Sequence, residues 1–402
     1  MEKKRIVITG IGVVAPNGIG KEEFWANCFA GVSGIKPITL FDVSKYRCRW
    51  AGEISNFQPE KYLGPKGLRN LDRTTLLALV AAKLAIDDAR LEITDENRND
   101  IGVVLGTNGS IHSISEFDKE GLREGPRYVN PAHFPNTVIN SPASQVAIRY
   151  GLKGLNTTIS TGFTASLDAI GYAMDMLRLG RVKVLLVGGA EELCIQTYLG
   201  FYKLSLLALT PNGSLPTFAP GRVEGHGTIL GEGAVFLICE SEAEAQIRRV
   251  EPLAIIEGYG TCFDPKAMYR YDPEAKGACT AVRAALVDAG IEPEELKSIS
   301  SCANGVYGCD TTARQIVDKV LRGRQVARVF ALKGLLGETF SADGALRLAA
   351  AIGGIDLDAG VVCPSVLVEG SGPIGTSSAV VLQLTAVRSK AAMYRSSEVA
   401  TR

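Results

Sequence analysis

Short runs of β-branched residues bounded by glycine recur along the chain and alternate with segments of helical periodicity. The segment from Asp72 to Ala89 places its apolar residues on one helical stripe, and a second helix is predicted from about Thr311 to Leu321. Strands that alternate with helices in this way indicate an α/β fold. The predicted strands are Arg5–Val14, Ile101–Gly106, Val182–Gly189, Ala234–Cys239, Leu253–Tyr259, Val329–Leu332 and Ser378–Leu384.

The strand pattern also restarts in the middle of the chain. Arg5-Ile-Val-Ile-Thr-Gly-Ile-Gly opens one set of strands, and Leu253-Ala-Ile-Ile-Glu-Gly-Tyr-Gly opens another after a charged stretch. This similarity predicts two similar halves, residues 1–245 and 246–387, followed by a polar tail over 388–402. Ordinary α/β alternation is the alternative explanation for the two openings.

Composition excludes several classes of function. The chain has 43 Lys and Arg against 43 Asp and Glu, so no global field gathers nucleic acid or an anionic membrane. Its nine Cys residues include no C-x-x-C pair, and no His lies at zinc-ligand spacing. No apolar stretch reaches the roughly 18 to 20 residues that span a bilayer, and the opening residues lack a signal-peptide pattern. We therefore expect a cytoplasmic protein without a metal site.

One glycine motif suggests a dinucleotide cofactor and is rejected. The run Gly10-Ile-Gly-Val-Val-Ala15 follows a strand, as the fingerprint requires. However, Pro16-Asn-Gly18 forms a turn where a helix must begin to hold the pyrophosphate, and the helical pattern starts only near Lys21. The motif is therefore interpreted as a strand-turn sequence, and no cofactor is predicted.

The segment from Thr158 to Ala173 carries the most functional information. A strand enters a tight turn and then a helix of small residues, which is the layout that presents a turn residue at a buried helix N-terminus. The residue presented is Phe163. The segment resembles the nucleophile elbow of β-ketoacyl synthases, in which a Cys occupies this position and is activated as a thiolate by the helix terminus.

The resemblance to β-ketoacyl synthases extends over nearly the whole chain. It includes the opening run from Arg5 to Gly18, Gly31-Val-Ser-Gly-Ile, Gly231-Glu-Gly-Ala and Gly372-Pro-Ile-Gly-Thr376. It implies a thiolase-type fold of five layers, made of two similar α/β halves, and an obligate dimer with active sites beside the interface.

The family's other catalytic positions also depart from its pattern. The resemblance places the family's two histidines at Asn304 and Glu338, and its gating Phe at Pro373, whereas the family's lysine is retained as Lys333. In the family the histidines stabilise the thioester carbonyl and the developing enolate, which an ionised Glu338 would repel. We expect a buried ion pair between Lys333 and Glu338. The chain's own histidines, His112, His133 and His226, align with none of these positions.

Coordinated loss of the nucleophile, both histidines and the gate indicates a non-catalytic paralogue. Within the family, such subunits are the chain length factors, also called ketosynthase β subunits. The resemblance implies a heterodimer with a catalytic ketosynthase α subunit that elongates an acyl or polyketide chain on acyl carrier protein. The carrier protein brings the phosphopantetheine, so the chain needs no cofactor of its own.

The resemblance further implies which residues bound the acyl tunnel. The run from Gly106 to Ile111 and the run from Pro131 to Asn136 are expected at the dimer interface, with Phe201 near the pocket. Side-chain volume in these segments is then expected to set product length. The residues assigned to length control are Gly109, Ser110, His133, Phe134, Phe163 and Phe201.

Two other functions remain open from the sequence. One is an acyltransferase with rewired chemistry that uses Asn304, Lys333 and Glu338 without a covalent intermediate, although Phe163 opposes the open pocket it needs. The other is a homodimeric protein that binds acyl chains or acyl carrier protein. A neighbouring gene for an intact synthase with Cys and two His favours the chain length factor.

Overall fold

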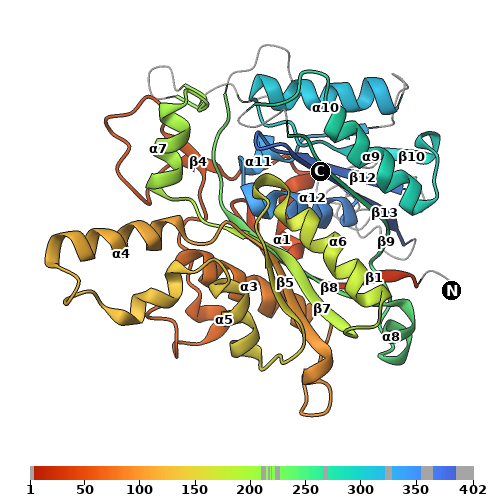
Figure 1. The fold of residues 1–402 in the computed structure, drawn as a ribbon, viewed down its shortest axis with the longest axis horizontal. Coiled ribbons are helices and arrows are strands. Elements are labelled where there is room, and N and C mark those ends of the chain that lie inside the picture. Colours follow the sequence, from red (N-terminus) through yellow and green to blue (C-terminus); the bar gives the residue numbers. More distant parts are fainter. Residues whose placement is uncertain are drawn as a thin grey trace, which may run out of the picture.

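A mixed β-sheet of eleven strands runs through the protein (Figure 1). The computed structural model describes residues 4–209, 214–215, 218, 220–221, 227–265, 270–321, 328–354 and 365–385. The strand order is β11-β10-β12-β13-β9-β1-β8-β7-β5-β6, and β2 pairs with β1 outside this path. The strands are β1 Ile6–Ala15, β2 Gly18–Ile19, β5 Ile101–Gly106, β6 Asn156–Ile159, β7 Val184–Glu191, β8 Gly233–Ser241, β9 Ala254–Phe263, β10 Leu296–Ser300, β11 Arg328–Phe330, β12 Ser365–Ser371 and β13 Thr376–Leu384, while β3 Ile35–Pro37 and β4 Trp50–Gly52 form a separate pair.

The sheet contains the same topology twice. From its centre outward, the first half runs β1, β8, β7, β5, β6, and the second runs β9, β13, β12, β10, β11. When the five strands of each half are numbered in chain order, with β2 left aside, they lie in the sheet in the order first, fifth, fourth, second, third. The pairings match as well, because the two inner contacts of each half are antiparallel and the two outer ones are parallel. The expected fold of two similar halves is confirmed.

Helices pack on both faces of each half and complete five layers (Figure 1). Helices α3 and α5 cover the outer face of the first half, α6 and α12 lie between the halves, and α9 and α10 cover the second. The helices are α1 Lys21–Phe29, α2 Glu60–Leu63, α3 Arg73–Asp88, α4 Ile111–Glu124, α5 Ser141–Tyr150, α6 Ala165–Arg178, α7 Ile195–Lys203, α8 Glu242–Ile247, α9 Lys276–Ala289, α10 Tyr307–Val320, α11 Lys333–Leu336 and α12 Asp343–Ile352.

The two central helices are closely packed because protein lies on both of their sides. Every residue of α12 is buried. In α6, Gly171 lies under Tyr259 of β9, where an added Cβ would sit 2.4 Å from the ring atom Cε1. The Tyr259 hydroxyl donates to Asp168 Oδ1 at 2.7 Å. Helix α6 is thereby fixed against the second half while its N-terminus stays at the carboxyl ends of β5 and β7.

Most predicted elements are found, with shifted ends. The helix predicted from Asp72 is α3, capped by the Asp72 carboxylate on Thr75 N, and the one predicted from about Thr311 is α10, which starts earlier at Tyr307. The strand predicted to enter the turn at Phe163 is β6, whereas β2, β3, β4, β10 and β12 were not predicted. The predicted tail over 388–402 lies outside the described residues. Within the described ranges, no helix combines the length and apolar character required to cross a membrane.

Candidate functional site

Phe163 lies at the turn between β6 and the N-terminus of α6. Gly162 has a φ of 72°, a left-handed conformation that favours glycine, and the 3-10 turn Gly162–Thr164 leads directly into α6. A Cβ at Gly162 would lie 3.1 Å from Ile374 Cδ1, so the turn is also close-packed. The residue that the sequence analysis placed at the nucleophile position is thus at a helix N-terminus, but its side chain is a hydrocarbon.

Phe340 joins two of the predicted site positions into one aromatic cluster. Its ring lies edge-on to Phe163 and to Phe201, with ring centroids 5.3 Å apart in both pairs. The glycine loop, residues 372–375, passes close to the Phe163 ring, because a Cβ at Gly372 would lie 3.3 Å from Phe163 Cδ2. The structure therefore brings together Phe163, Phe201 and the loop that contains Pro373. Phe340 was not predicted from the sequence.

Phe340 is held in an unusual backbone conformation. Its φ is 48°, which is costly for a residue with a bulky side chain, and its ring is buried. Its backbone N–H donates to Glu338 Oε1 at 3.0 Å. The carboxylate of Glu338 therefore fixes the turn that directs Phe340 at Phe163, which links the ionic and aromatic parts of the site.

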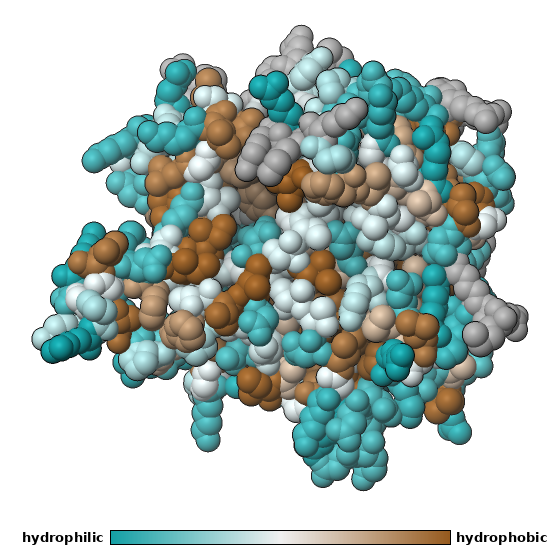
Figure 2. Space-filling model, viewed as in Figure 1, coloured by the Kyte–Doolittle hydropathy of each residue, from teal (hydrophilic) through white to brown (hydrophobic). Residues whose placement is uncertain are grey.

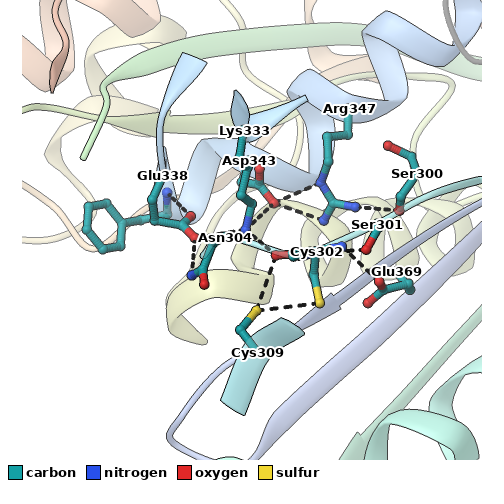
Figure 3. Close-up of polar contacts among 12 residues, drawn as sticks. Ser300, Ser301, Cys302, Asn304, Cys309, Lys333, Glu338, Asp343, Arg347 and Glu369 are labelled. Atoms are coloured by element: carbon teal, nitrogen blue, oxygen red, sulfur yellow. Dashed lines mark hydrogen bonds and ion pairs between the residues drawn. The ribbon is translucent and has the colours of Figure 1, made fainter. Parts of the chain in front are cut away.

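The predicted ion pair between Lys333 and Glu338 is confirmed (Figure 3). Lys333 Nζ lies 2.8 Å from Glu338 Oε2, and both side chains are buried. The ammonium group also contacts Asp343 Oδ2 at 3.3 Å and donates to the Cys302 carbonyl at 2.9 Å. Burial opposes the charged form of Lys333, but the carboxylates of Asp343 and Glu338 outweigh it and raise the lysine's pKa.

Asn304 makes its hydrogen bonds within the protein rather than toward a pocket. Its Nδ2 donates to Glu338 Oε2 at 2.8 Å, and its Oδ1 accepts from Val306 N at 3.1 Å. The backbone N–H groups of Asn304 and Gly305 both donate to Asp310 Oδ1. The two positions that the resemblance assigned to histidines, Asn304 and Glu338, are therefore bonded to each other.

Two charged residues of this cluster, Asp343 and Arg347, were not predicted from the sequence. Arg347 is fully buried, and its Nε donates to Asp343 Oδ2 at 2.9 Å while Nη1 donates to the Ser300 carbonyl at 2.7 Å. Both residues lie on α12, four positions apart, in a run that otherwise contains only Gly, Ala, Leu and Ile. A charged pair at i and i+4 within such an apolar run is the signal that points to a buried ion pair.

The predicted length-control residues fall in two different environments. Ser110 is buried, caps α4 by accepting from Ser113 N, and donates to Glu192 Oε1 at 2.8 Å. Gly109 has a φ of 76°, and a Cβ there would lie 3.3 Å from Ile139. In contrast, His133 and Phe134 lie on the exposed 3-10 segment Pro131–Thr137. The Phe134 ring packs on Phe117 of α4, with centroids 6.0 Å apart.

Helix α4 and the segment that follows it project from the body of the molecule (Figure 1). Figure 2 shows brown apolar residues among the teal ones along this projection and at its base. Phe134 is 57% exposed although it is aromatic. The exposed apolar side chains here are Ile111, Ile114, Leu122, Tyr128, Phe134, Val138 and Ile139. An apolar surface of this kind is typical of a protein interface.

No metal centre is indicated in the part of the chain that the structure describes. Within it, no group of three or more His, Cys, Asp or Glu side chains is arranged to hold a metal ion. The buried charges of the site are instead matched by one another, with Lys333 and Arg347 facing Glu338 and Asp343.

Family models match both halves of the chain, and related proteins match most of its length. Residues 3–245 match the model of the β-ketoacyl synthase N-terminal domain, and residues 253–369 match that of the C-terminal domain. A 3-oxoacyl-[acyl-carrier-protein] synthase 2 of Coxiella burnetii is 33% identical over 86% of this chain and 84% of its own length. The protein of the same name from Synechocystis is 29% identical over 93% of this chain and 90% of its own length.

Two of the similar solved structures resemble this one over almost their full length. The structure described as the ishigamide ketosynthase/chain length factor superposes with a TM-score of 0.85 at 28% identity, covering 95% of this chain and 99% of that one. A type II polyketide synthase ketosynthase, solved in complex with its acyl carrier protein and bound to the hexaketide, gives a TM-score of 0.83 at 25% identity, covering 96% of this chain and 100% of that one.

Proposed function

Because this chain belongs to the β-ketoacyl synthase family, we propose that it is a chain length factor, a subunit without catalytic activity of its own. It pairs with a catalytic ketosynthase, which elongates an acyl or polyketide chain on acyl carrier protein. This chain completes the partner's structure and bounds the tunnel into which the product grows. The carrier protein delivers the acyl group on its phosphopantetheine.

The observation that carries this proposal is the side chain at the helix N-terminus of the site. Phe163 offers only carbon where acyl transfer through a covalent intermediate needs a thiolate, and its ring packs against Phe340. The two rings occupy the end of α6 at which a thioester would be bound. An acyltransferase with rewired chemistry needs that space to be open, so the aromatic pair argues against this alternative.

The ionic cluster supports the same proposal. Decarboxylative condensation develops negative charge on an enolate, and catalysis requires hydrogen-bond donors aimed at that charge. In this chain the corresponding positions hold the Glu338 carboxylate and the Asn304 amide, which are bonded to each other. The Glu338 carboxylate, paired with Lys333, stabilises the fold but cannot stabilise the negative charge of an enolate.

The apolar surface of α4 and the segment Pro131–Thr137 is proposed to contact the catalytic partner. The edge strand β6 pairs only with β5 among the described strands, so its other edge has no strand partner there. A partner that covered this surface and continued the sheet would shield both features. A similar solved structure is itself described as a ketosynthase/chain length factor.

Co-expression of this chain with catalytic synthases from the same genome tests the pairing. We expect a stable heterodimer that survives affinity purification and size-exclusion chromatography. Ile114→Asp on α4 should reduce the recovered partner by at least about tenfold, because it buries a charge in the contact. The matched control Val287→Asp, at an exposed position on α9, should pair as the parent does. A well-behaved monomer that ignores every such synthase would overturn the proposal.

Side-chain volume near the expected tunnel should control product length. Gly109→Phe should shorten the product of the reconstituted pair, because a growing chain stops where its next unit would overlap packed atoms. Gly109→Ala is the matched control, since it shares the strain of a side chain at a φ of 76° but adds little volume. Phe134→Ala should lengthen the product or broaden its distribution.

Mass spectrometry of the released products measures the chain length of each variant. The proposal requires that Gly109→Phe and Gly109→Ala differ and that all three variants still pair. If the pairs form normally and every product is unaltered, Gly109 and Phe134 do not line the end of the tunnel.

A further inference from the structure

Two cysteines lie close together beneath the loop that carries Asn304. Cys302 Sγ and Cys309 Sγ are 3.8 Å apart (Figure 3), and their residues are 0% and 1% exposed. Cys302 follows β10, and Cys309 lies in the first turn of α10. A bond between the two sulfurs would close a ring over residues 302–309, which includes Asn304 and Gly305.

Hydrogen bonds hold both cysteines in place. The Cys302 N–H donates to Glu369 Oε1 at 2.8 Å, and its carbonyl accepts from Lys333 Nζ at 2.9 Å. The same carbonyl accepts from Cys309 Sγ at 3.2 Å. Hydrogen bonds therefore fix the backbone of Cys302, and the Cys309 thiol is held next to it by its own hydrogen bond to the Cys302 carbonyl. A thiol pair held in this way does not need a large backbone movement to meet.

Tyr271 is the aromatic neighbour of the pair. It packs against the apolar cluster that contains both cysteines and is itself only partly buried. It also lines a small cavity of about 20 Å³, together with Thr312 of α10 and Gly372 of the glycine loop. A cavity of this size holds one molecule as small as water. Neither cysteine lines this cavity, so an oxidant reaches the pair only when the Tyr271 ring moves, and the cavity has no room for a bulky oxidant such as glutathione.

We propose that Cys302 and Cys309 form a peroxide-sensitive dithiol that is oxidised to an intramolecular disulfide. Hydrogen peroxide oxidises the Cys309 thiol to a sulfenic acid and releases one water. The Cys302 thiol then attacks the sulfenic sulfur, the S–S bond forms, and the hydroxyl leaves as a second water with the Cys302 proton. In total, two thiols and one hydrogen peroxide give one disulfide and two waters.

The chemical environment sets this order of events. The hydrogen bond with Cys309 and burial both raise the pKa of Cys302, which disfavours it as the first thiol to react. Bond formation brings the sulfurs from 3.8 Å to about 2.05 Å and removes the Cys309 hydrogen bond to the Cys302 carbonyl. Lys333 then remains as the side-chain donor to the Cys302 carbonyl. The disulfide fixes both ends of the loop that carries Asn304.

Peroxide titration of the full-length folded protein tests this proposal. After treatment, the intact mass is measured first, and free thiols are then alkylated for peptide mapping without reduction. We expect a mass loss of about 2 Da per chain, a mapped link between Cys302 and Cys309, and reversal by dithiothreitol. Cys262→Ala is the control, because Cys262 is the partly exposed cysteine of the described residues and should not affect the link.

The variants Cys302→Ala and Cys309→Ala should both lose the 2 Da shift. Cys302→Ala should instead accumulate an adduct of about 16 Da on Cys309, since the resolving thiol is missing. The wild-type peptide map decides the question even if a variant does not fold. If Cys262 is oxidised before any link between Cys302 and Cys309 appears, or if the link never forms, the proposal is wrong.

Discussion

Phe163→Cys is expected to leave condensation about 10⁴ to 10⁶ times slower than in a catalytic synthase assayed in parallel. The variant supplies a thiol at the N-terminus of α6, where the helix terminus favours a thiolate. It does not supply the donors for the thioester carbonyl and the enolate, because Asn304 and Glu338 are bonded to each other. Each missing donor costs about 10² to 10³ in rate, and two such losses multiply.

Phe163→Ser provides the matched control for this measurement. It opens the same space beside Phe340 but lacks a thiol, so it gives the background rate. Condensation of malonyl and acyl groups is followed on carrier protein by mass spectrometry, with and without the catalytic partner. Turnover by Phe163→Cys within a hundredfold of the catalytic synthase would show that Asn304 and Glu338 do not limit the chemistry.

Lys333→Met is expected to lower the free energy of unfolding by about 3 to 5 kcal/mol. The variant keeps the volume of the side chain but leaves Glu338 without its cation and Asp343 with Arg347 alone. Glu338 has no exposed surface, so water cannot replace the lysine. Adding Glu338→Gln should recover part of the loss, because the second change removes the unpaired charge.

The contribution of Lys333 to the stability of the parent protein should be independent of pH near neutrality. The lysine's pKa is raised in the folded protein, so its contribution is present below the pKa of an ordinary lysine and is lost only as pH rises through the higher folded value. Denaturation by urea from about pH 6 to 9 measures this. Lys83→Met is the control, because Lys83 forms a more exposed pair with Asp87 and should change stability by less than about 1 kcal/mol. An equally small loss in Lys333→Met would show that the cluster is hydrated.

Periodicity was sufficient to predict the elements in which buried residues follow a regular pattern. The strand β5 was predicted with its observed ends because it is an apolar run buried on both faces, and α3 because its apolar stripe faces the sheet. The strand β6 was predicted only as the strand that enters the turn at Phe163, and its ends were not predicted because it has only four residues, three of them polar. The doubled strand order depends on pairing between distant segments, which local sequence does not specify.

The candidate site was predicted only in part for a related reason. The resemblance identified Phe163, Asn304, Glu338 and Lys333, but it did not show that Phe340 connects them. Phe340 follows Glu338 by two residues and looks like any apolar residue, whereas its left-handed φ depends on the hydrogen bond from its N–H to the carboxylate. Cys302 lies in a loop and Cys309 in the first turn of a helix. Their spacing in the sequence matches no known motif, so their contact was not predicted.

Whether any residue of this chain becomes acylated tests the central proposal most directly. The isolated protein is incubated with acyl and malonyl carrier protein, and its intact mass is measured beside that of a catalytic synthase treated in the same way. The aromatic pair of Phe163 and Phe340 predicts an unchanged mass for this chain and an acyl adduct on the synthase. A stable acyl adduct on any residue of this chain would contradict a non-catalytic role.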